Sequence, residues 1–210
     1  MAFQTPAFLT RLLRPFTTSV SRPLAPDSLA TSTSLPATAE RAIFAGGCFW
    51  GLEDLYRRDF ASRGLLDCRV GYIGGTTPAP DYRSVCSGRT NHAEALLLAY
   101  DPAQLSYTTL CEYFFKMHDP TTLNRQGADT GTQYRSAIFY ENDKQREIAE
   151  KIKQKVEKEW YKGQKVSTEI TAATQWFDAE DYHQDYLTKT PYGYHCPAHY
   201  VRKFPALSED

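Results

Sequence analysis

Residues 41–60 read R-A-I-F-A-G-G-C-F-W-G-L-E-D-L-Y-R-R-D-F, and this stretch decides the fold. Its beginning is a short apolar run, which predicts a buried strand over Arg41–Ala45. The spacing of the large apolar residues then predicts a helix that begins near Cys48. The residues at this spacing are Phe49, Leu52, Tyr56 and Phe60.

The sequence beyond this stretch continues to alternate between strand and helix patterns. Apolar runs predict further strands, and cap residues followed by apolar periodicity predict helices that start after Ser106, running to His118, and after Asn142, with Gln145 three residues on. We therefore expect a single α+β domain, a mixed sheet with helices packed on it. The predicted strands are Leu65–Ile73, His92–Tyr100, Arg135–Tyr140 and Val166–Ala172.

Two long segments between these elements are predicted loops. Residues 74–91 are rich in Gly, Pro, Ser and Thr, and residues 119–134 are mostly polar. Loops of this length in compact domains are often functional. Irregular structure is expected again after Thr188, because Pro191, Gly193 and Pro197 follow.

The composition argues against two classes of function. The chain has 210 residues and a net charge of -1, without the basic excess that is typical of nucleic-acid binding. No run of about 18 apolar residues occurs, so no membrane-spanning helix is predicted. A hydrophobic content of 41% is sufficient for a core.

Residues 1–40 form a leader that differs in composition from the rest of the chain. Arg11, Arg14 and Arg22 are its only basic residues, no acid precedes Asp27, and Ser, Thr, Ala and Pro fill the remainder. This composition is typical of a mitochondrial transit peptide, and a tail without a targeting role is the alternative. We expect a mitochondrial protein, and the sequence leaves open a cytoplasmic form from another start. We also expect a domain over residues 41–204 and a short tail over 205–210.

The cysteines do not form a disulfide framework. Their number is odd, they are widely spaced, and no C-x-x-C pair occurs, which fits a reducing compartment in which one or two thiols react. They are Cys48, Cys68, Cys86, Cys111 and Cys196.

Cys48 is the first candidate for a reactive thiol. At a helix N-terminus, free N–H groups and the helix dipole favour the thiolate, so the sequence predicts a lowered pKa. Gly46 and Gly47 can adopt positive φ and bring a substrate close to the backbone. Phe49 and Trp50 are adjacent and cannot both face the core, so one should lie beside the thiol as an apolar wall. An inert, buried cysteine remains the alternative.

Glu94 is the second candidate, in N-H-A-E-A-L-L-L-A-Y, residues 91–100. Alternation places it on one face with His92, Leu96, Leu98 and Tyr100, and both faces are apolar beyond their first residues, which predicts a central strand. Burial would raise the pKa of Glu94 and keep it protonated, an acid beside a nucleophile. The alternative is a solvent-facing Glu paired with an Arg.

The predicted loops and the end of the chain contain further polar candidates. Tyr82, Asp129 and Tyr134 lie in the two long loops and offer hydrogen-bonding groups, although each alone fits a turn or a packing role. The run H-C-P-A-H, residues 195–199, could contain zinc ligands. Alternatively, Cys196 lies on a mobile tail and resolves an oxidised Cys48.

In order and spacing, the motifs from residue 41 to 204 resemble those of the A-type peptide-methionine sulfoxide reductases. The resemblance covers nearly the whole chain beyond the leader and is far more specific than any single motif. The matching segments are G-G-C-F-W-G at 46–51, G-Y-I-G-G at 71–75, Y-R-S-V-C-S-G at 82–88, H-A-E at 92–94, H-D-P-T at 118–121, N-R-Q-G-A-D-T-G-T-Q-Y-R-S at 124–136 and A-E-D-Y-H-Q-D-Y-L at 179–187.

The resemblance implies reduction of the S epimer of methionine sulfoxide, protein-bound or free, by a plait-like α+β domain with a ferredoxin-like core. It implies no metal and no organic cofactor, and we expect a monomer. It assigns the residues as follows: Cys48 is the nucleophile, Phe49 and Trp50 receive the S-methyl group, Glu94 is the acid assisted by Tyr82 and Tyr134, and Asp129 belongs to the substrate site.

The resemblance also implies a recycling route. Cys48 becomes a sulfenic acid, Cys196 condenses with it to a disulfide, and thioredoxin reduces the disulfide. Cys68, Cys86 and Cys111 are then structural thiols, and the alternative for Cys86, which lies in an active-site loop, is a surrogate resolver.

The chain departs from the family pattern at two places, and other functions remain open. T-N-H-A-E stands where many members have Gly before the His, and G-Y-I-G-G carries Ile where a small residue is commoner. Both departures affect the shape of the pocket rather than a catalytic group. The competing hypotheses are a thiol peroxidase that uses Cys48 and a zinc-bound interaction module built on residues 195–199.

Overall fold

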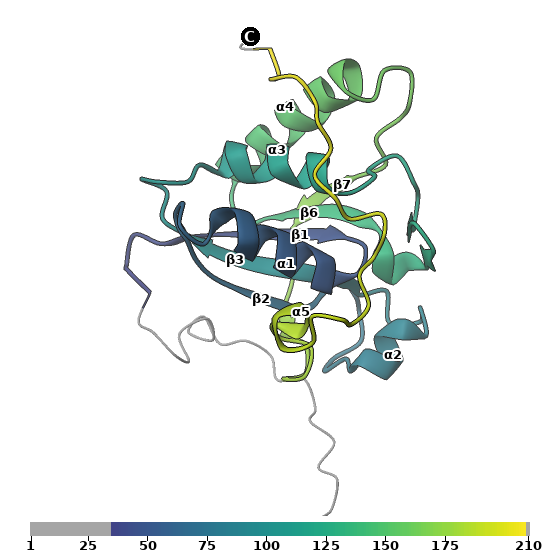
Figure 1. Ribbon diagram of the computed structural model, residues 1–210. Helices are drawn as coiled ribbons and strands as arrows, with labels where there is room; N and C mark the ends of the chain where they lie inside the picture. The colour runs from purple at the N-terminus through teal and green to yellow at the C-terminus, as the bar shows by residue number, and fades with distance from the viewer. Residues whose placement is uncertain (1–34, 209–210) are drawn as a thin grey trace, which may run out of the picture.

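A computed structural model describes residues 35–208 of the chain, and residues 1–34, most of the predicted leader, lie outside the described residues. Strand β1 spans Glu40–Gly46 and helix α1 spans Phe49–Phe60 (Figure 1). The strand and the helix predicted from residues 41–60 are therefore confirmed. Cys48 is the residue immediately before the helix, and the turn that leads to it passes through Gly47 at φ 98°.

Six strands form one mixed sheet in the order β7-β6-β1-β3-β2-β8. Strand β3 pairs antiparallel with β1 on one side and β2 on the other, so its predicted central position is confirmed. Strand β7 is parallel to β6, and the other pairs in this sheet are antiparallel. The bounds are Leu65–Ile73 for β2, Ala93–Tyr100 for β3, Ser136–Tyr140 for β6, Glu169–Ala172 for β7 and Phe177–Asp178 for β8.

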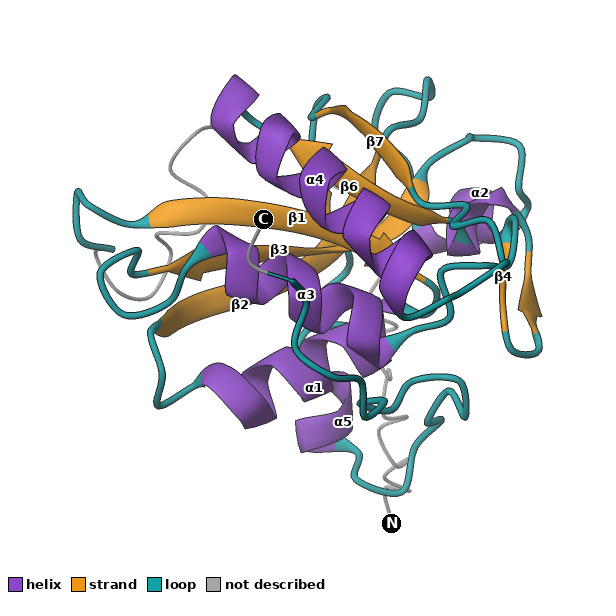
Figure 2. Cartoon of the chain, turned by 90° about the horizontal axis from the view of Figure 1, so that it is seen from above, coloured by secondary structure: helices purple, strands orange, loops and turns teal. Residues whose placement is uncertain are grey.

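Three helices lie on one face of the sheet: α1, α3 (Tyr107–Met117) and α4 (Asp143–Glu159) (Figure 2). Their N-termini are fixed as the sequence predicts. The side chain of Ser106 accepts from Thr109 N at 3.1 Å, and that of Asn142 accepts from Gln145 N at 2.9 Å. Such caps each stabilise a helix by about 1 kcal/mol.

The main core fills the space between these helices and the sheet. Alternation along β3 sends Leu96, Leu98 and Tyr100 into it, and the same alternation turns Glu94 toward the helices. The opposite face of the sheet carries a second cluster, half of which is alanine: Ile43, Ala45, Ile73, Ala93, Ala95, Leu97, Ala99, Ala137, Phe139 and Trp176. Among the described residues, no helix has the length and apolar character needed to cross a membrane.

Short elements interrupt the segments that were predicted to be irregular. Residues 74–91 contain helix α2 (Tyr82–Cys86), and residues 119–134 contain a two-stranded hairpin and one 3₁₀ turn, Thr132–Tyr134. The hairpin consists of β4 (Arg125–Gln126) and β5 (Asp129–Thr130). These elements are held by local caps and tertiary contacts, which apolar periodicity does not reveal.

The predicted strand over Val166–Ala172 is shorter than expected and is not the last one. It begins at Glu169, because the Ser167 N–H donates to Pro120 O at 2.7 Å instead of joining the sheet. Strand β8 follows it in the sequence and lies beside β2. The chain then forms a short helix α5 (Tyr186–Lys189) before the irregular structure that the prolines predict.

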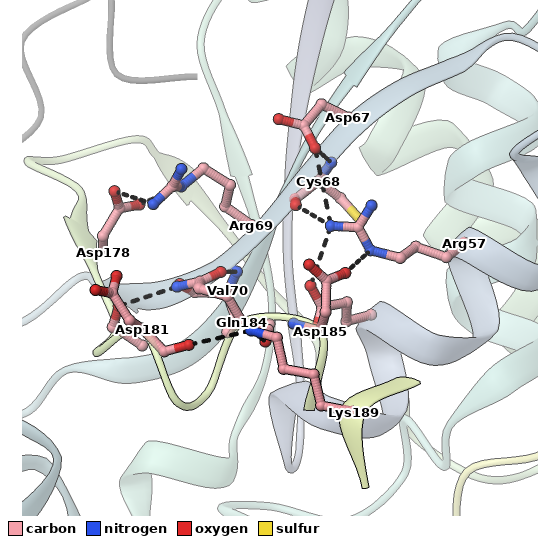
Figure 3. A network of polar contacts seen from close by, with 12 residues as sticks. Arg57, Asp67, Cys68, Arg69, Val70, Asp178, Asp181, Gln184, Asp185 and Lys189 are labelled. Atoms are coloured by element: carbon pink, nitrogen blue, oxygen red, sulfur yellow. Dashed lines mark hydrogen bonds and ion pairs between the residues drawn. The ribbon is translucent and has the colours of Figure 1, made fainter. Parts of the chain in front are cut away.

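A polar network attaches residues 178–189 to β2 and α1 (Figure 3). The Gln184 amide bonds both backbone groups of Val70, accepting at 3.0 Å and donating at 2.9 Å. Arg57 from α1 pairs with Asp185 at 2.8 Å and donates to Cys68 O at 2.7 Å. These contacts fix the position of residues 178–189, the segment that approaches the N-terminus of α1.

Candidate active site

A small cavity of about 240 Å³ opens at the N-terminus of α1. It brings together seven of the eight residues that the sequence singles out, from five different parts of the chain, and one residue that it does not, Tyr194. Its lining is Cys48, Phe49, Trp50, Tyr82, Glu94, Asp129, Tyr134 and Tyr194. Cys196, the eighth candidate, is buried in the tail that follows Tyr194.

The turn before Cys48 depends on its glycines, although only one of them has the predicted conformation. Gly47 adopts positive φ, and a Cβ there would lie 2.6 Å from the Cβ of Gln126. Gly46 does not adopt positive φ. Its Cβ would instead lie 2.9 Å from the Phe114 ring, so Gly46 is required for packing.

The Cys48 thiol is buried, with 6% of the residue exposed, and the prediction of a lowered pKa is wrong. Burial raises the pKa of Cys48 well above its ordinary value, and the nearby Glu94 carboxyl raises it further. The backbone N–H of Trp50 lowers the pKa as the helix N-terminus argument requires, but by less. Loss of solvation therefore outweighs the helix terminus, and the resting group is a thiol.

Glu94 is 2% exposed and lies beside this thiol. The register of the sheet places it opposite Tyr72 on β2, and its Oε2 accepts from Phe49 N at 3.2 Å. Burial raises the pKa of Glu94 to about 8, the Phe49 N–H lowers it, and Asp129 raises it. Among the described residues no ion pair with Glu94 is found, so the Arg-paired alternative is not what the structure shows.

Two tyrosines approach the same cavity from the loops. Tyr82 is the first residue of α2 and Tyr134 the last of the 3₁₀ turn. Burial raises the pKa of both phenols, and Glu94 raises them further, so both stay protonated donors. Both hydroxyls reach the Cys86 sulfur, which places this half-buried thiol behind the tyrosines.

Of the two aromatic residues after Cys48, one packs in the core and the other is partly exposed at the cavity, as predicted. Phe49 is 1% exposed and packs on Tyr72 with ring centroids 5.9 Å apart. Trp50 is only partly buried, and its indole forms one wall of the cavity. The Tyr186 ring stacks on that indole at 3.8 Å and 17°.

Asp129 faces the cavity from the β4–β5 hairpin and is held by the tail. Tyr194 OH lies 3.1 Å from each of its two carboxylate oxygens. The Cys196 sulfur also forms a hydrogen bond with Asp129. A charge on Cys196 would raise the pKa of Cys48, so the second thiol lies near the first. Tyr194 lies in the run P-Y-G-Y-H-C, residues 191–196, in which the sequence pattern indicated Cys196 but not Tyr194 as a residue of this site.

The tail is irregular, as predicted, but it is packed rather than mobile. Cys196 is 4% exposed. Beyond it, Tyr200 N donates to Met117 O at 3.1 Å and Arg202 N to Lys116 O at 2.9 Å. The two histidines of H-C-P-A-H bond backbone carbonyls, His199 at Gly46 O and His195 at Pro191 O. No group of three or more potential metal ligands is clustered within residues 35–208.

Comparison with known proteins shows what this chain is similar to. Residues 40–208 match the family model described as peptide methionine sulfoxide reductase. A probable peptide methionine sulfoxide reductase of Schizosaccharomyces pombe is 50% identical over 162 residues, covering 77% of this chain and 95% of that protein. The MsrA of Nocardia farcinica is also 50% identical, over 77% of this chain and 90% of its own length.

Solved structures agree with these matches. Reduced Mxr1 from Saccharomyces cerevisiae aligns with a TM-score of 0.77 at 41% identity, covering 83% of this chain and 98% of that chain. The same yeast protein has been solved in complex with Trx2, and that chain aligns with a TM-score of 0.57 at 29% identity, covering 83% and 97%.

Proposed function

The chain belongs to the peptide methionine sulfoxide reductase family and is an oxidoreductase of that type, and from this premise we propose that Cys48 attacks the sulfur of methionine-S-sulfoxide. The carrying observation is the cavity in which the Cys48 thiol lies beside a buried Glu94 that is protonated at neutral pH. The substrate is methionine sulfoxide within oxidised proteins or as the free amino acid, and the reaction repairs oxidative damage.

Substrate binding uses the asymmetry of the cavity. The S-methyl group lies against Phe49 and Trp50, which present apolar surface. The sulfoxide oxygen, which carries negative charge, points to Glu94 and to the hydroxyls of Tyr82 and Tyr134. Asp129 accepts from a polar group of the substrate. Because one side of the cavity is apolar and the other donates hydrogen bonds, only one epimer aligns its sulfur with the thiol.

The first chemical step needs two protons on the sulfoxide oxygen. We assign one to Glu94 and one to the Cys48 thiol, since both groups rest protonated. As the Cys48 sulfur bonds to the substrate sulfur, the S–O bond breaks and water leaves. The product is a thiosulfonium, with Glu94 now a carboxylate.

The second step returns the proton. Water attacks the Cys48 sulfur, Glu94 takes one of its protons, and the bond between the two sulfurs breaks. Methionine is released, Cys48 is a sulfenic acid and Glu94 is again protonated. The net result is that methionine sulfoxide is reduced and the Cys48 thiol is oxidised to a sulfenic acid, whose oxygen comes from the attacking water.

Recycling uses the tail and an external dithiol. The Cys196 thiol attacks the Cys48 sulfenic acid, releases water and forms a disulfide, which thioredoxin reduces by thiol exchange. The yeast Mxr1–Trx2 complex supports thioredoxin as this donor. Because thiols supply both electrons, the proposal requires no metal and no organic cofactor.

The recycling assignment has a direct test. Cys196→Ser should complete one turnover at the normal rate and then stop with thioredoxin, while the wild type continues. Mass spectrometry of the wild type after one turnover should find a Cys48–Cys196 bridge. A different dominant pairing, such as Cys48–Cys86, would refute the resolver role of Cys196.

Three further properties stay proposals. The antiparallel order β6-β1-β3-β2, with α1 and α3 as the connections, supports a ferredoxin-like plait as the core. We expect a monomer, which sedimentation would check. Residues 1–40 are proposed to direct the protein to mitochondria, and a fluorescent protein fused to them should localise there, while one fused to an Arg11→Gln, Arg14→Gln leader should not.

The experiment that tests the function is an assay with separate epimers. The wild type should reduce methionine-S-sulfoxide far faster than the R epimer or hydrogen peroxide, and Cys48→Ser should reduce none of them. Equal turnover of both epimers would remove the stereospecific part of the proposal. Faster turnover of peroxide would favour a thiol peroxidase.

A further inference from the structure

The indole of Trp50 has one polar atom, and that atom is bound by a residue with no role in the reaction just described. Trp50 Nε1–H donates to His183 Nδ1 at 3.1 Å. His183 belongs to A-E-D-Y-H-Q-D-Y-L, residues 179–187, and is 1% exposed. A buried histidine that accepts from a wall of the cavity has a defined protonation state.

The bond to Trp50 fixes the tautomer of His183. Nδ1 accepts a hydrogen bond and so carries no proton, which leaves the proton on Nε2. Nε2 is buried and has no hydrogen-bond partner within the described residues, and Glu180 Oε2 is 3.8 Å away. Burial lowers the pKa of His183 to about 4, so the ring stays neutral and the acceptor is present at physiological pH.

The same imidazole contacts two other residues of the cavity. Its ring centroid is 4.4 Å from that of Tyr82 and 5.1 Å from that of Phe49. Glu180, one turn earlier, accepts from the backbone N–H of Tyr82 at 2.9 Å and from Tyr72 OH at 2.8 Å. Residues 180–183 therefore touch both the apolar and the donor side of the cavity.

Two restraints act on the indole in different directions. Stacking on Tyr186 restrains tilt of the Trp50 plane but permits rotation within that plane. The directed bond to His183 restrains that rotation, because turning the indole breaks it. Both residues come from the segment that Gln184 and Asp185 attach to β2 and α1 (Figure 3).

We propose that His183 is a positioning residue which holds the Trp50 indole as the wall of the S-alkyl site and thereby limits the size of the alkyl group that the site accepts. The inference deepens the proposed function and rests on its placement of the substrate methyl group. Its two parts, the contact and the size limit, are tested separately.

The contact is tested by NMR of the indole N–H groups, which requires no activity. The chain has three tryptophans, and the other two indoles are internal references: Trp160 donates to Pro205 O at 3.0 Å and Trp176 to Asp178 Oδ1 at 2.9 Å. In His183→Phe the Trp50 signal should shift and exchange with water roughly tenfold faster, as loss of one hydrogen bond of about 1.4 kcal/mol implies.

Three variants control this measurement. In His183→Asn the amide oxygen replaces Nδ1, so the Trp50 signal should stay protected. His195→Phe makes the same change at an exposed histidine of the tail and should leave Trp50 unchanged. His183→Leu carries the same prediction as His183→Phe where the larger ring does not fold. An unmoved Trp50 signal, or equal movement of all three indoles, would overturn the contact.

The size limit is tested by comparing methionine-S-sulfoxide with ethionine-S-sulfoxide, which is larger by one methylene. The kcat/KM for methionine-S-sulfoxide divided by that for ethionine-S-sulfoxide should fall about tenfold in His183→Phe, since one methylene is worth about 1–3 kcal/mol in such a site. In His183→Asn this ratio should stay within about twofold of the wild-type value. A general loss of folded enzyme lowers both values and leaves the ratio unchanged.

An unchanged ratio in a folded His183→Phe protein would overturn the positioning role. Absence of turnover of either sulfoxide by the wild type would overturn the proposed function and the size limit with it. The NMR result would still decide whether His183 holds Trp50.

Discussion

At the scale of single residues, the chemistry proposed for the cavity depends on two buried groups that are both protonated at rest. In the proposed mechanism, the Cys48 thiol and the Glu94 carboxyl together supply the two protons that convert a sulfoxide oxygen to water. A negative charge on either group raises the pKa of the other, so the pair favours the state with no net charge. A reactive thiolate at rest is therefore not required; the thiol loses its proton as the substrate oxygen gains one.

Replacement of the acid should slow the chemical step and change its pH dependence. Glu94 must be protonated to donate, so the rate of sulfenic acid formation should fall as the pH rises through about 8. In Glu94→Gln the single-turnover rate at pH 7 should be roughly 100-fold lower, and this limb of the profile should disappear. Single-turnover kinetics between pH 6 and 9 check this, and an unchanged rate would remove Glu94 from the acid role.

The same substitution should stabilise the fold. The folded pKa of Glu94, about 8, lies above the ordinary value of 4.5, so the folded state holds a proton that the unfolded state releases. Stability then falls as the pH rises between these values, by up to roughly 1.4 kcal/mol per pH unit. The Gln side chain of Glu94→Gln does not ionise, so this loss of stability with rising pH is absent from the variant. Urea unfolding should show the variant to be more stable by a margin that grows from pH 5 to 8, and a constant margin would contradict the argument.

At the scale of elements, the smallest ones carry the site. Helix α2 has five residues, yet it supplies Tyr82 and Cys86. Asp81 caps it by accepting from Ser84 N at 2.8 Å, while the Ser84 hydroxyl accepts from Asp81 N at 3.0 Å. A helix this short has little intrinsic stability, so its cap determines how well Tyr82 is held.

Loss of this cap should therefore affect activity more than stability. Asp81→Ala should speed amide exchange in residues 82–87 and lower kcat/KM, because Tyr82, the proposed donor to the sulfoxide oxygen, is then held less firmly. Asn142→Ala removes a comparable cap, worth about 1 kcal/mol, from α4, which lines no part of the cavity. Hydrogen exchange and kinetics on both variants check this, and equal losses of activity would contradict it.

The elements also show what a sequence can predict. Strands with a long apolar pattern were predicted closely: Leu65–Ile73 was placed to the residue, and the strand predicted over His92–Tyr100 begins one residue later, at Ala93. Helix α2, the β4–β5 hairpin and helix α5 were missed, because each is too short to have a period and is held by hydrogen bonds to residues far away in the sequence, namely Glu180, Tyr194 and Glu53. Those missed elements carry Tyr82, Asp129 and Tyr186.

At the scale of the whole molecule, the cavity is assembled by the tail. After β8 the chain passes Trp50, turns at Tyr194 onto Asp129 and buries Cys196. It then passes the end of α3 and reaches the end of α4, where Phe204 stacks on Trp160 at 4.8 Å. The two thiols of the proposed cycle therefore come from opposite ends of the described chain and meet only in the folded protein.

This long-range assembly limits what the sequence reveals about the site. Local patterns pointed to Cys48 and Glu94 but left an alternative for each, and the resemblance to the reductase family assigned the candidate residues their roles. The protonation state of Cys48 was predicted wrongly, because a helix N-terminus is visible in a sequence and the burial that opposes it is not. His183 and Tyr194 were not selected, since their roles depend on contacts with residues 133 and 65 positions away.

The most direct test of the account is the detection of the sulfenic acid formed on Cys48. Reduced Cys196→Ser protein is mixed with one equivalent of methionine-S-sulfoxide, trapped with dimedone and analysed by mass spectrometry. The account predicts one methionine released per protein and one sulfenic acid adduct, located at Cys48, and little of either with the R epimer. Methionine released without an adduct at Cys48, or an adduct at another cysteine, would contradict it.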